Sequence, residues 1–135
     1  MRMLNKVDVR VARVVRTTKP WGHEDLFAIV EGQYVGKILF VRSGESLSLQ
    51  FHHYKDETIA VQSGRILLEV GSSAEKLKRY ELTRSQSVRI PPGTLHRITA
   101  LEDAEILEAS SATIGWREDV VRLEDRYKRQ GTTDP

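Results

Sequence analysis

The stretch LSLQFHHYKDET, residues 47–58, places a glutamine, two adjacent histidines and a glutamate in one short segment. Its apolar and polar residues alternate at the start, which favours a β-strand whose side chains two apart share a face. Gln50 and His52 therefore point to one side together with Ser48, whereas His53 points to the other. The segment predicts a strand with a polar inner face.

Two further polar residues are expected to reach the same face. The tight bend at residues 53–56 lets the following strand run back antiparallel and present Glu57 across from His52. Residues 90–98, IPPGTLHRI, then offer a rigid Pro-Pro-Gly turn with His96 at the start of another strand.

These residues form a set of donors that suits a metal ion. The set consists of one amide oxygen, two imidazoles and one carboxylate, from Gln50, His52, Glu57 and His96. It fits a divalent ion, with zinc or manganese favoured and iron or nickel as alternatives. Histidines on strands also occur as ordinary hydrogen-bonded residues, so a metal-free protein is the competing interpretation.

The composition narrows the class of protein. The chain has 135 residues, 39% hydrophobic and 30% charged, which fits one soluble domain with a real core. Its 21 basic and 19 acidic residues are interspersed, which argues against a nucleic-acid-binding protein. Cysteine is absent, so disulfides and thiolate metal sites are excluded. The N-terminus lacks a signal peptide and no apolar run is long enough for a membrane span, so we expect a cytoplasmic protein.

Short strands separated by turn residues run along most of the chain. This spacing predicts an all-β protein of the jelly-roll class. The strand-like segments are 7–15, 26–31, 34–41, 47–53, 57–71, 80–98 and 104–112, with a turn at 19–22 and a polar loop at 72–79.

The two ends of the chain differ from the barrel expected at 19–113. The alternation in VDVRVARVV predicts that residues 7–15 form an outer strand. Residues 116–129 are expected to close the barrel as a short helical segment, since Glu118 lies four residues before Arg122. Residues 130–135 are expected to be disordered.

Two stretches resemble the sequence motifs of the cupin superfamily. The first is GESLSLQFHHYKDETIAVQSG (44–64), and the second is PPGTLH (91–96). The residues in register with the motifs are Gly44, His52, Glu57, Gly64, Pro91, Gly93 and His96. Gln50 stands where the first motif usually has a histidine, and Ser85 and Ala100 replace the usual glycine and asparagine of the second.

A glutamine at this position of the first motif resembles the phosphomannose isomerase branch of the cupins. KPWG (19–22), GKILFV (36–41) and EDVVRLEDRYKR (118–129) resemble the same branch, so the likeness spans residues 18–129. It implies a single-domain cupin jelly roll with Gln50, His52, Glu57 and His96 as metal ligands. Lys55 stands where the branch often has an arginine, and Thr58 where it has a histidine.

The resemblance implies an enzyme, an aldose–ketose isomerase of the mannose-6-phosphate isomerase type that uses the metal as a Lewis acid. A cupin that binds a sugar or a small acid without isomerising it fits the same ligands. A non-haem iron oxygenase is a weaker third alternative, because such cupins usually present three histidines.

Other residues are candidates for contacts with a sugar phosphate. Basic side chains at the barrel mouth would bind the phosphate, and Lys37, Lys55 and Arg122 are the candidates. Arg97 ranks lower because strand parity points it away from His96. His53 and Glu108 are candidate bases. A homodimer is expected, with the edge of the N-terminal strand as one interface.

Overall fold

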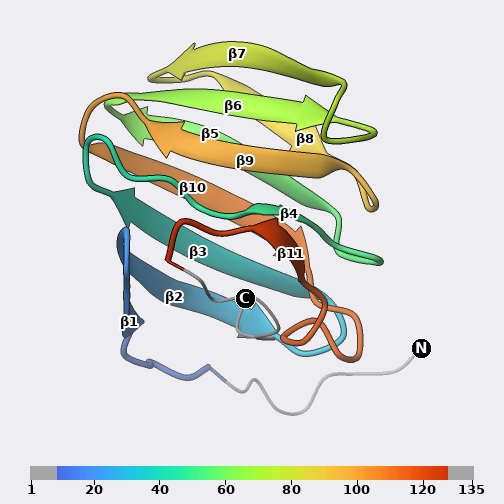
Figure 1. Ribbon diagram of the computed structural model, residues 1–135. Helices are drawn as coiled ribbons and strands as arrows, with labels where there is room; N and C mark the ends of the chain where they lie inside the picture. Colours follow the sequence, from blue (N-terminus) through green and yellow to red (C-terminus); the bar gives the residue numbers. More distant parts are fainter. Residues whose placement is uncertain (1–8, 128–135) are drawn as a thin grey trace.

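The computed structural model describes residues 9–127, and these residues fold into two antiparallel β-sheets that face each other (Figure 1). Six strands form the first sheet, in the order β1-β2-β3-β10-β5-β8, and five form the second, in the order β11-β4-β9-β6-β7. From β3 to β10 the chain crosses repeatedly between the sheets, as in a jelly roll. The prediction of an all-β jelly roll is confirmed.

The strands follow the alternation of apolar residues along the chain. In chain order they are β1 Val15–Lys19, β2 Gly22–Val30, β3 Tyr34–Val41, β4 Leu49–Phe51, β5 Glu57–Ser63, β6 Arg65–Gly71, β7 Leu77–Thr83, β8 Ser87–Ile90, β9 Leu95–Ala100, β10 Ala104–Ser111 and β11 Val121–Glu124. In β10 buried and exposed residues alternate almost without exception, which is the pattern of a strand with one face on the core.

The core lies between the sheets, and some of its members border the cavity that holds the polar residues of the first motif. Its buried members are Trp21, Leu39, Val41, Ile59, Val61, Ile66, Leu68, Leu82, Ile90, Ile98, Ala100, Ala104 and Ile106. A smaller cluster of Val35, Ala112 and Trp116 packs with Leu26 beside the first three strands. The apolar core thus fills one part of the barrel and leaves the rest to polar side chains.

The last glycine of the first motif has a conformational role. Gly64 connects β5 to β6 with φ +80°, in the left-handed region that favours glycine. A Cβ at this position would lie 2.1 Å from the carbonyl oxygen of Asp103. The turn between the two strands therefore requires glycine.

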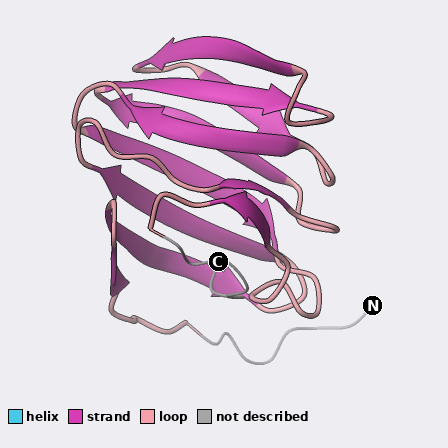
Figure 2. Cartoon of the chain, viewed as in Figure 1, coloured by secondary structure: helices cyan, strands magenta, loops and turns pink. Residues whose placement is uncertain are grey.

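The prediction of a short helical segment near the C-terminal end is wrong. Between residues 9 and 127 the structure has no helix (Figure 2). Residues 114–118 form turns, and β11 then pairs with β4. Burial of Trp116 and Val120 and the pairing with β4 override the weak helical signal of the Glu118–Arg122 spacing. Residues 128–135 lie outside the described part.

The N-terminal strand also differs from its prediction. It begins at Val15, and residues 9–14 belong to no strand in the described part of the chain. Val9 and Val11 are almost fully exposed, because no neighbouring strand pairs with this segment. Residues 7 and 8 lie outside the described residues. No helix among the described residues has the length and apolar character needed to cross a membrane.

Candidate metal centre

Three of the four predicted ligands meet at one point inside the barrel. His52 follows β4, Glu57 is the first residue of β5, and His96 is the second residue of β9. One ligating atom from each lies within 4.8 Å of the others, and all three side chains are buried. Residues from both sheets and from both sequence motifs therefore form one group.

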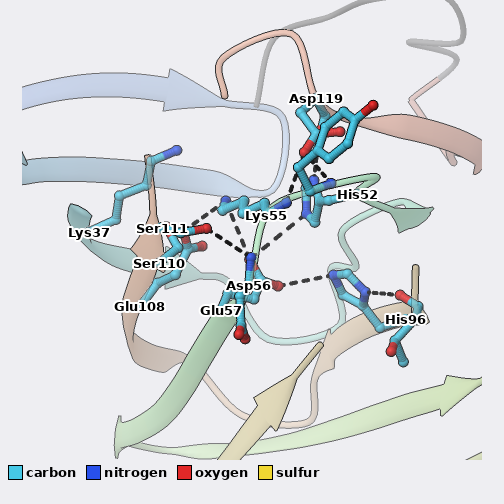
Figure 3. A network of polar contacts seen from close by, with 12 residues as sticks. Lys37, His52, Lys55, Asp56, Glu57, His96, Glu108, Ser110, Ser111 and Asp119 are labelled. Atoms are coloured by element: carbon cyan, nitrogen blue, oxygen red, sulfur yellow. Dashed lines mark hydrogen bonds and ion pairs between the residues drawn. The ribbon is translucent and has the colours of Figure 1, made fainter. Parts of the chain in front are cut away.

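The carboxylate of Glu57 faces both imidazoles (Figure 3). Its Oε1 lies 3.1 Å from His96 Nε2, and its Oε2 lies 3.8 Å from His52 Nε2. The two Nε2 atoms thus point to the same carboxylate, which is the arrangement a shared metal ion requires.

The other nitrogen of each ring is held by the backbone. His52 Nδ1 donates to the carbonyl of Asp119 at 2.5 Å, and His96 Nδ1 donates to the carbonyl of Thr94 at 2.9 Å. These contacts fix the tautomer and leave Nε2 as the ligand atom, as is usual for metal-bound histidines. The backbone N–H of Gly93 also donates to the carbonyl of His52 at 2.7 Å, which ties the Pro-Pro-Gly turn to the first motif.

Gln50 lies beside this group on β4. It is the register partner of His96 on β9 and of Arg122 on β11. Directly opposed residues of antiparallel strands share a face, so the three side chains form a row on the inner face of the second sheet. All three line the same cavity. Gln50 is thus placed where a fourth donor would be needed.

A loop between β4 and β5 presents His52, and Asp119 holds this loop. The Asp119 carboxylate accepts the backbone N–H groups of His53, Tyr54 and Lys55 at 2.7 to 2.9 Å. Its backbone carbonyl accepts His52 Nδ1 at the same time. One residue therefore fixes both the loop and the ring orientation of a candidate ligand.

Lys55 lies next to the candidate ligands and is buried. Its Nζ is 3.3 Å from Glu57 Oε2 and 2.9 Å from Glu108 Oε2. Glu108 also accepts the hydroxyl of Ser110 at 3.2 Å. One ammonium group is thus shared by two buried carboxylates.

These groups line a cavity with a volume of about 50 Å³. Its walls contain all three predicted substrate contacts and one predicted base. The polar lining residues are Lys19, Glu24, Lys37, Ser48, Gln50, His52, Lys55, Glu57, His96, Glu108 and Arg122.

Two candidates lie elsewhere. His53 is exposed and its ring packs edge-on against Phe51, so the side chain does not line the cavity. Arg97 pairs with Glu69 and Glu124 outside the cavity. The structure therefore separates His53 from the cavity and leaves Glu108 as the candidate base that lines it.

Burial and charge shift the pKa values of the group in different directions. Burial lowers the pKa of His52, and the nearby Lys55 ammonium lowers it further. Burial opposes a charge on His96 too, but contact with Glu57 outweighs it and the pKa of His96 is raised. Burial would raise the pKa of Glu57, yet Lys55 and the two histidines hold it well below its usual range.

These features fit a divalent metal ion. The group offers two imidazole nitrogens whose tautomers are fixed, one ionised carboxylate and a neighbouring amide. This is a donor set for zinc or a similar first-row ion. Lys55 beside Glu57 supplies an opposing positive charge, so affinity is expected to be lower than for the same ligands alone.

Three polar residues at the cavity and its loop were not singled out from the sequence. Asp119 lies in the segment that was expected to be helical, where no pattern marks it as a loop anchor. Lys19 and Glu24 flank the turn at residues 20 and 21, and both side chains are buried. Glu24 could have been found from the alternation of β2, which places it on the same face as Leu26.

Comparison with known proteins places the chain among relatives of similar sequence and fold. The family model described as "Mannose-6-phosphate isomerase C-terminal" matches residues 6–125. The chain is 38% identical over 114 residues to the xanthan biosynthesis protein XanB of Xanthomonas campestris. These residues make up 82% of this chain and 23% of that protein. It is 34% identical over 119 residues to the alginate biosynthesis protein AlgA of Pseudomonas aeruginosa. These residues make up 87% of this chain and 23% of that protein.

The chain therefore spans less than a quarter of the length of these two relatives. Among solved structures, oxalate decarboxylase from Bacillus subtilis is similar with a TM-score of 0.71 and 15% sequence identity, covering 82% of this chain and 30% of that chain. At this identity the similarity concerns the fold alone.

Proposed function

The chain belongs to the family of mannose-6-phosphate isomerase C-terminal domains, and from that premise we propose that it is a metal-dependent aldose–ketose isomerase for a sugar phosphate such as mannose 6-phosphate. The observation that carries the proposal is the buried group of His52, Glu57 and His96 in a cavity with several cations. A zinc or manganese ion held by this group and Gln50 would act as a Lewis acid toward adjacent sugar oxygens. Iron or nickel would accept the same donors.

The charges around the cavity support an anionic substrate. Among the described residues that line it, four are cationic and three are carboxylates, namely Lys19, Lys37, Lys55 and Arg122 against Glu24, Glu57 and Glu108. A divalent ion would increase the positive excess. A phosphate ester would compensate this charge, because buried charges are stable only when paired.

The size of the cavity favours an opening movement when such a substrate binds. A volume of about 50 Å³ is well below the roughly 300–1,000 Å³ of ordinary ligand pockets. Of the walls, β11 is the easiest to displace, since it is an edge strand that pairs with β4 alone and with an irregular register. Outward movement of β11 would carry Arg122 away from the cavity and admit the sugar.

Glu108 is the residue we propose as the base. Isomerisation requires a group that takes the proton from C2 of the open-chain aldose and returns it to C1. Glu108 is buried, lines the cavity and is held by Lys55 and Ser110 near the candidate ligands.

We expect Glu108→Gln to lower kcat for the conversion of mannose 6-phosphate to fructose 6-phosphate by about 10²- to 10⁴-fold, the usual contribution of a general base. The amide keeps the shape of the side chain but cannot take up a proton. A coupled assay for fructose 6-phosphate on the full, metal-loaded chain measures this effect. Metal content, measured in parallel, should stay unchanged.

Glu105→Gln is the matched control, because Glu105 lies on the same strand but faces outward and is exposed. It should keep full activity. A wild-type protein that retains metal but produces no ketose would overturn the isomerase proposal.

A binding protein without isomerase activity is the second candidate. The small cavity favours it, because about 50 Å³ suits a small acid better than a hexose phosphate. In that case ligand binding should be measurable by calorimetry without turnover, so the same assay separates the two functions.

We also propose a homodimer and a cytoplasmic location. The exposed Val9 and Val11 support the dimer, since exposed apolar side chains can pack against a second copy. Light scattering of the full chain would contradict the dimer if it gave the monomer mass. Cysteine is absent, so nothing in the sequence demands an oxidising compartment.

A further inference from the structure

Three charged residues meet on the wall of the cavity formed by the first three strands. Lys19 ends β1, Glu24 lies on β2 and Lys37 lies on β3. Lys19 Nζ is 3.9 Å from Glu24 Oε1, and Lys37 Nζ is 3.2 Å from Glu24 Oε2. All three side chains are buried and line the cavity.

The position of Lys37 is fixed by its neighbours. Its ammonium lies 5.6 Å from the centre of the Trp116 ring, a cation–π distance, and Glu24 attracts it from another side. Lys37 is also the register partner of Glu108 on β10, but the contacts of the Glu108 carboxylate go to Lys55 and Ser110. In Figure 3, Lys37 accordingly stands apart from the network around Lys55.

The two polar clusters of the cavity differ in their charged groups. Around Lys55, one ammonium lies between the carboxylates of Glu57 and Glu108, next to the histidines. At the other wall, the ammonium groups of Lys19 and Lys37 lie 3.9 Å and 3.2 Å from the carboxylate of Glu24, so this wall presents two cations to the cavity. The cavity thus has one end suited to a cation and another suited to an anion.

Two buried ammonium groups that line one wall of a cavity attract an anion that enters it. Each ammonium has three N–H donors, so together they can hold Glu24 and also several oxygens of an anion. A tetrahedral phosphate group matches such a pair of point charges.

We propose that Lys19 and Lys37 form the subsite for the phosphate group of the ligand, while the histidine end of the cavity receives its reacting oxygens. This inference rests on the proposed function, because it assumes that one ligand spans both ends. It assigns the phosphate to Lys19 and Lys37, and it gives Lys55 the different task of positioning Glu57 and Glu108. Glu24 contacts both lysines and competes with the phosphate for their ammonium groups.

The test uses Lys19→Met and Lys37→Met in the full, metal-loaded chain. Each variant should weaken the binding of inorganic phosphate and of mannose 6-phosphate at least tenfold by calorimetry, with unchanged metal content. Binding of unphosphorylated mannose should not change. If the protein turns over mannose 6-phosphate, KM should rise more than kcat falls.

Two further variants guard against a folding artefact. Lys78→Met removes an exposed lysine on β7 and should bind phosphate like the wild type. Glu24→Gln keeps the shape of the site but removes its negative charge, so it should bind phosphate more tightly. A variant with lost phosphate binding and an intact melting temperature supports the subsite.

The outcomes separate this inference from the proposed reaction. If no isomerisation occurs but phosphate binding falls in both lysine variants, the subsite is right and the reaction is wrong. If isomerisation occurs and neither lysine affects phosphate affinity, the subsite is wrong. Binding of glucuronate that depends on the lysines as strongly as phosphate binding would overturn the choice of phosphate over a sugar carboxylate.

Discussion

Replacing His52 by alanine is expected to abolish the retention of a divalent metal ion by the protein. The change removes one of two imidazoles that face Glu57, so the remaining donors cannot surround a divalent ion. Metal affinity should fall by more than the loss of about 10- to 100-fold that is usual when a residue that only hydrogen-bonds a ligand is replaced. Metal analysis of the purified protein after dialysis measures it.

His53→Ala is the matched control, because it alters the adjacent residue of the same type. His53 is exposed and its contact with Asp119 is made by the backbone N–H, which alanine retains. Metal content should therefore equal that of the wild type. Equal retention of metal by both variants would mean that His52 is no ligand and that the buried group has a structural role.

Several strands rich in aliphatic residues were predictable from the sequence. The segment 34–41 coincides with β3 and the segment 57–71 contains β5 and β6, because runs of aliphatic and β-branched residues between turn residues indicate strands. The polar loop expected at 72–79 is shorter, since β7 begins at Leu77. This strand is mostly exposed and forms by pairing with β6, which a local pattern does not reveal.

The candidate ligands were predictable for a similar reason. Parity places Gln50 and His52 on one face, and the bend after them brings Glu57 across, so the sequence determines most of the geometry. His96 was identified from its place after a rigid Pro-Pro-Gly turn, at the start of a strand, and it also fits the second motif. Its pairing with Gln50 depends on the order of strands in the second sheet.

The groups that position these residues were less predictable. Asp119 follows His53 by 66 residues, and nothing near Asp119 in the sequence indicates that its carboxylate caps a distant loop. The contacts of Lys19 and Lys37 with Glu24 were similarly unpredictable, because they depend on the packing of three strands. The roles of these residues depend on contacts between segments that are far apart in the sequence, and local patterns do not predict such contacts.

Asp119→Asn is expected to destabilise the protein by about 2–4 kcal/mol. Three backbone N–H groups lose a charged acceptor, and hydrogen bonds to charged groups contribute about 1.5–3 kcal/mol each, of which an amide oxygen restores a part. Urea unfolding of the metal-free protein measures the difference. Metal affinity should fall about 10- to 100-fold as well, because the turn that orients His52 is weakened.

Glu118→Gln is the control for this variant, since Glu118 is the neighbouring acidic residue and is exposed. It should unfold at the same urea concentration as the wild type. If Asp119→Asn also unfolds at the urea concentration of the wild type, the carboxylate has no role in holding the loop.

The effect of Asp119→Asn should also depend on pH. Burial would raise the pKa of Asp119, but the three backbone N–H groups outweigh it and lower the pKa below its ordinary value. The unfolded chain has a pKa of about 3.9 for aspartate, so the stabilisation is complete above this pH and is lost as the pH falls through the lower folded value. The stability difference between wild type and variant should therefore be constant between pH 7 and about pH 5 and should shrink below about pH 4. A difference that persists undiminished to pH 2 would mean that the charge of Asp119 does not hold the loop that presents His52.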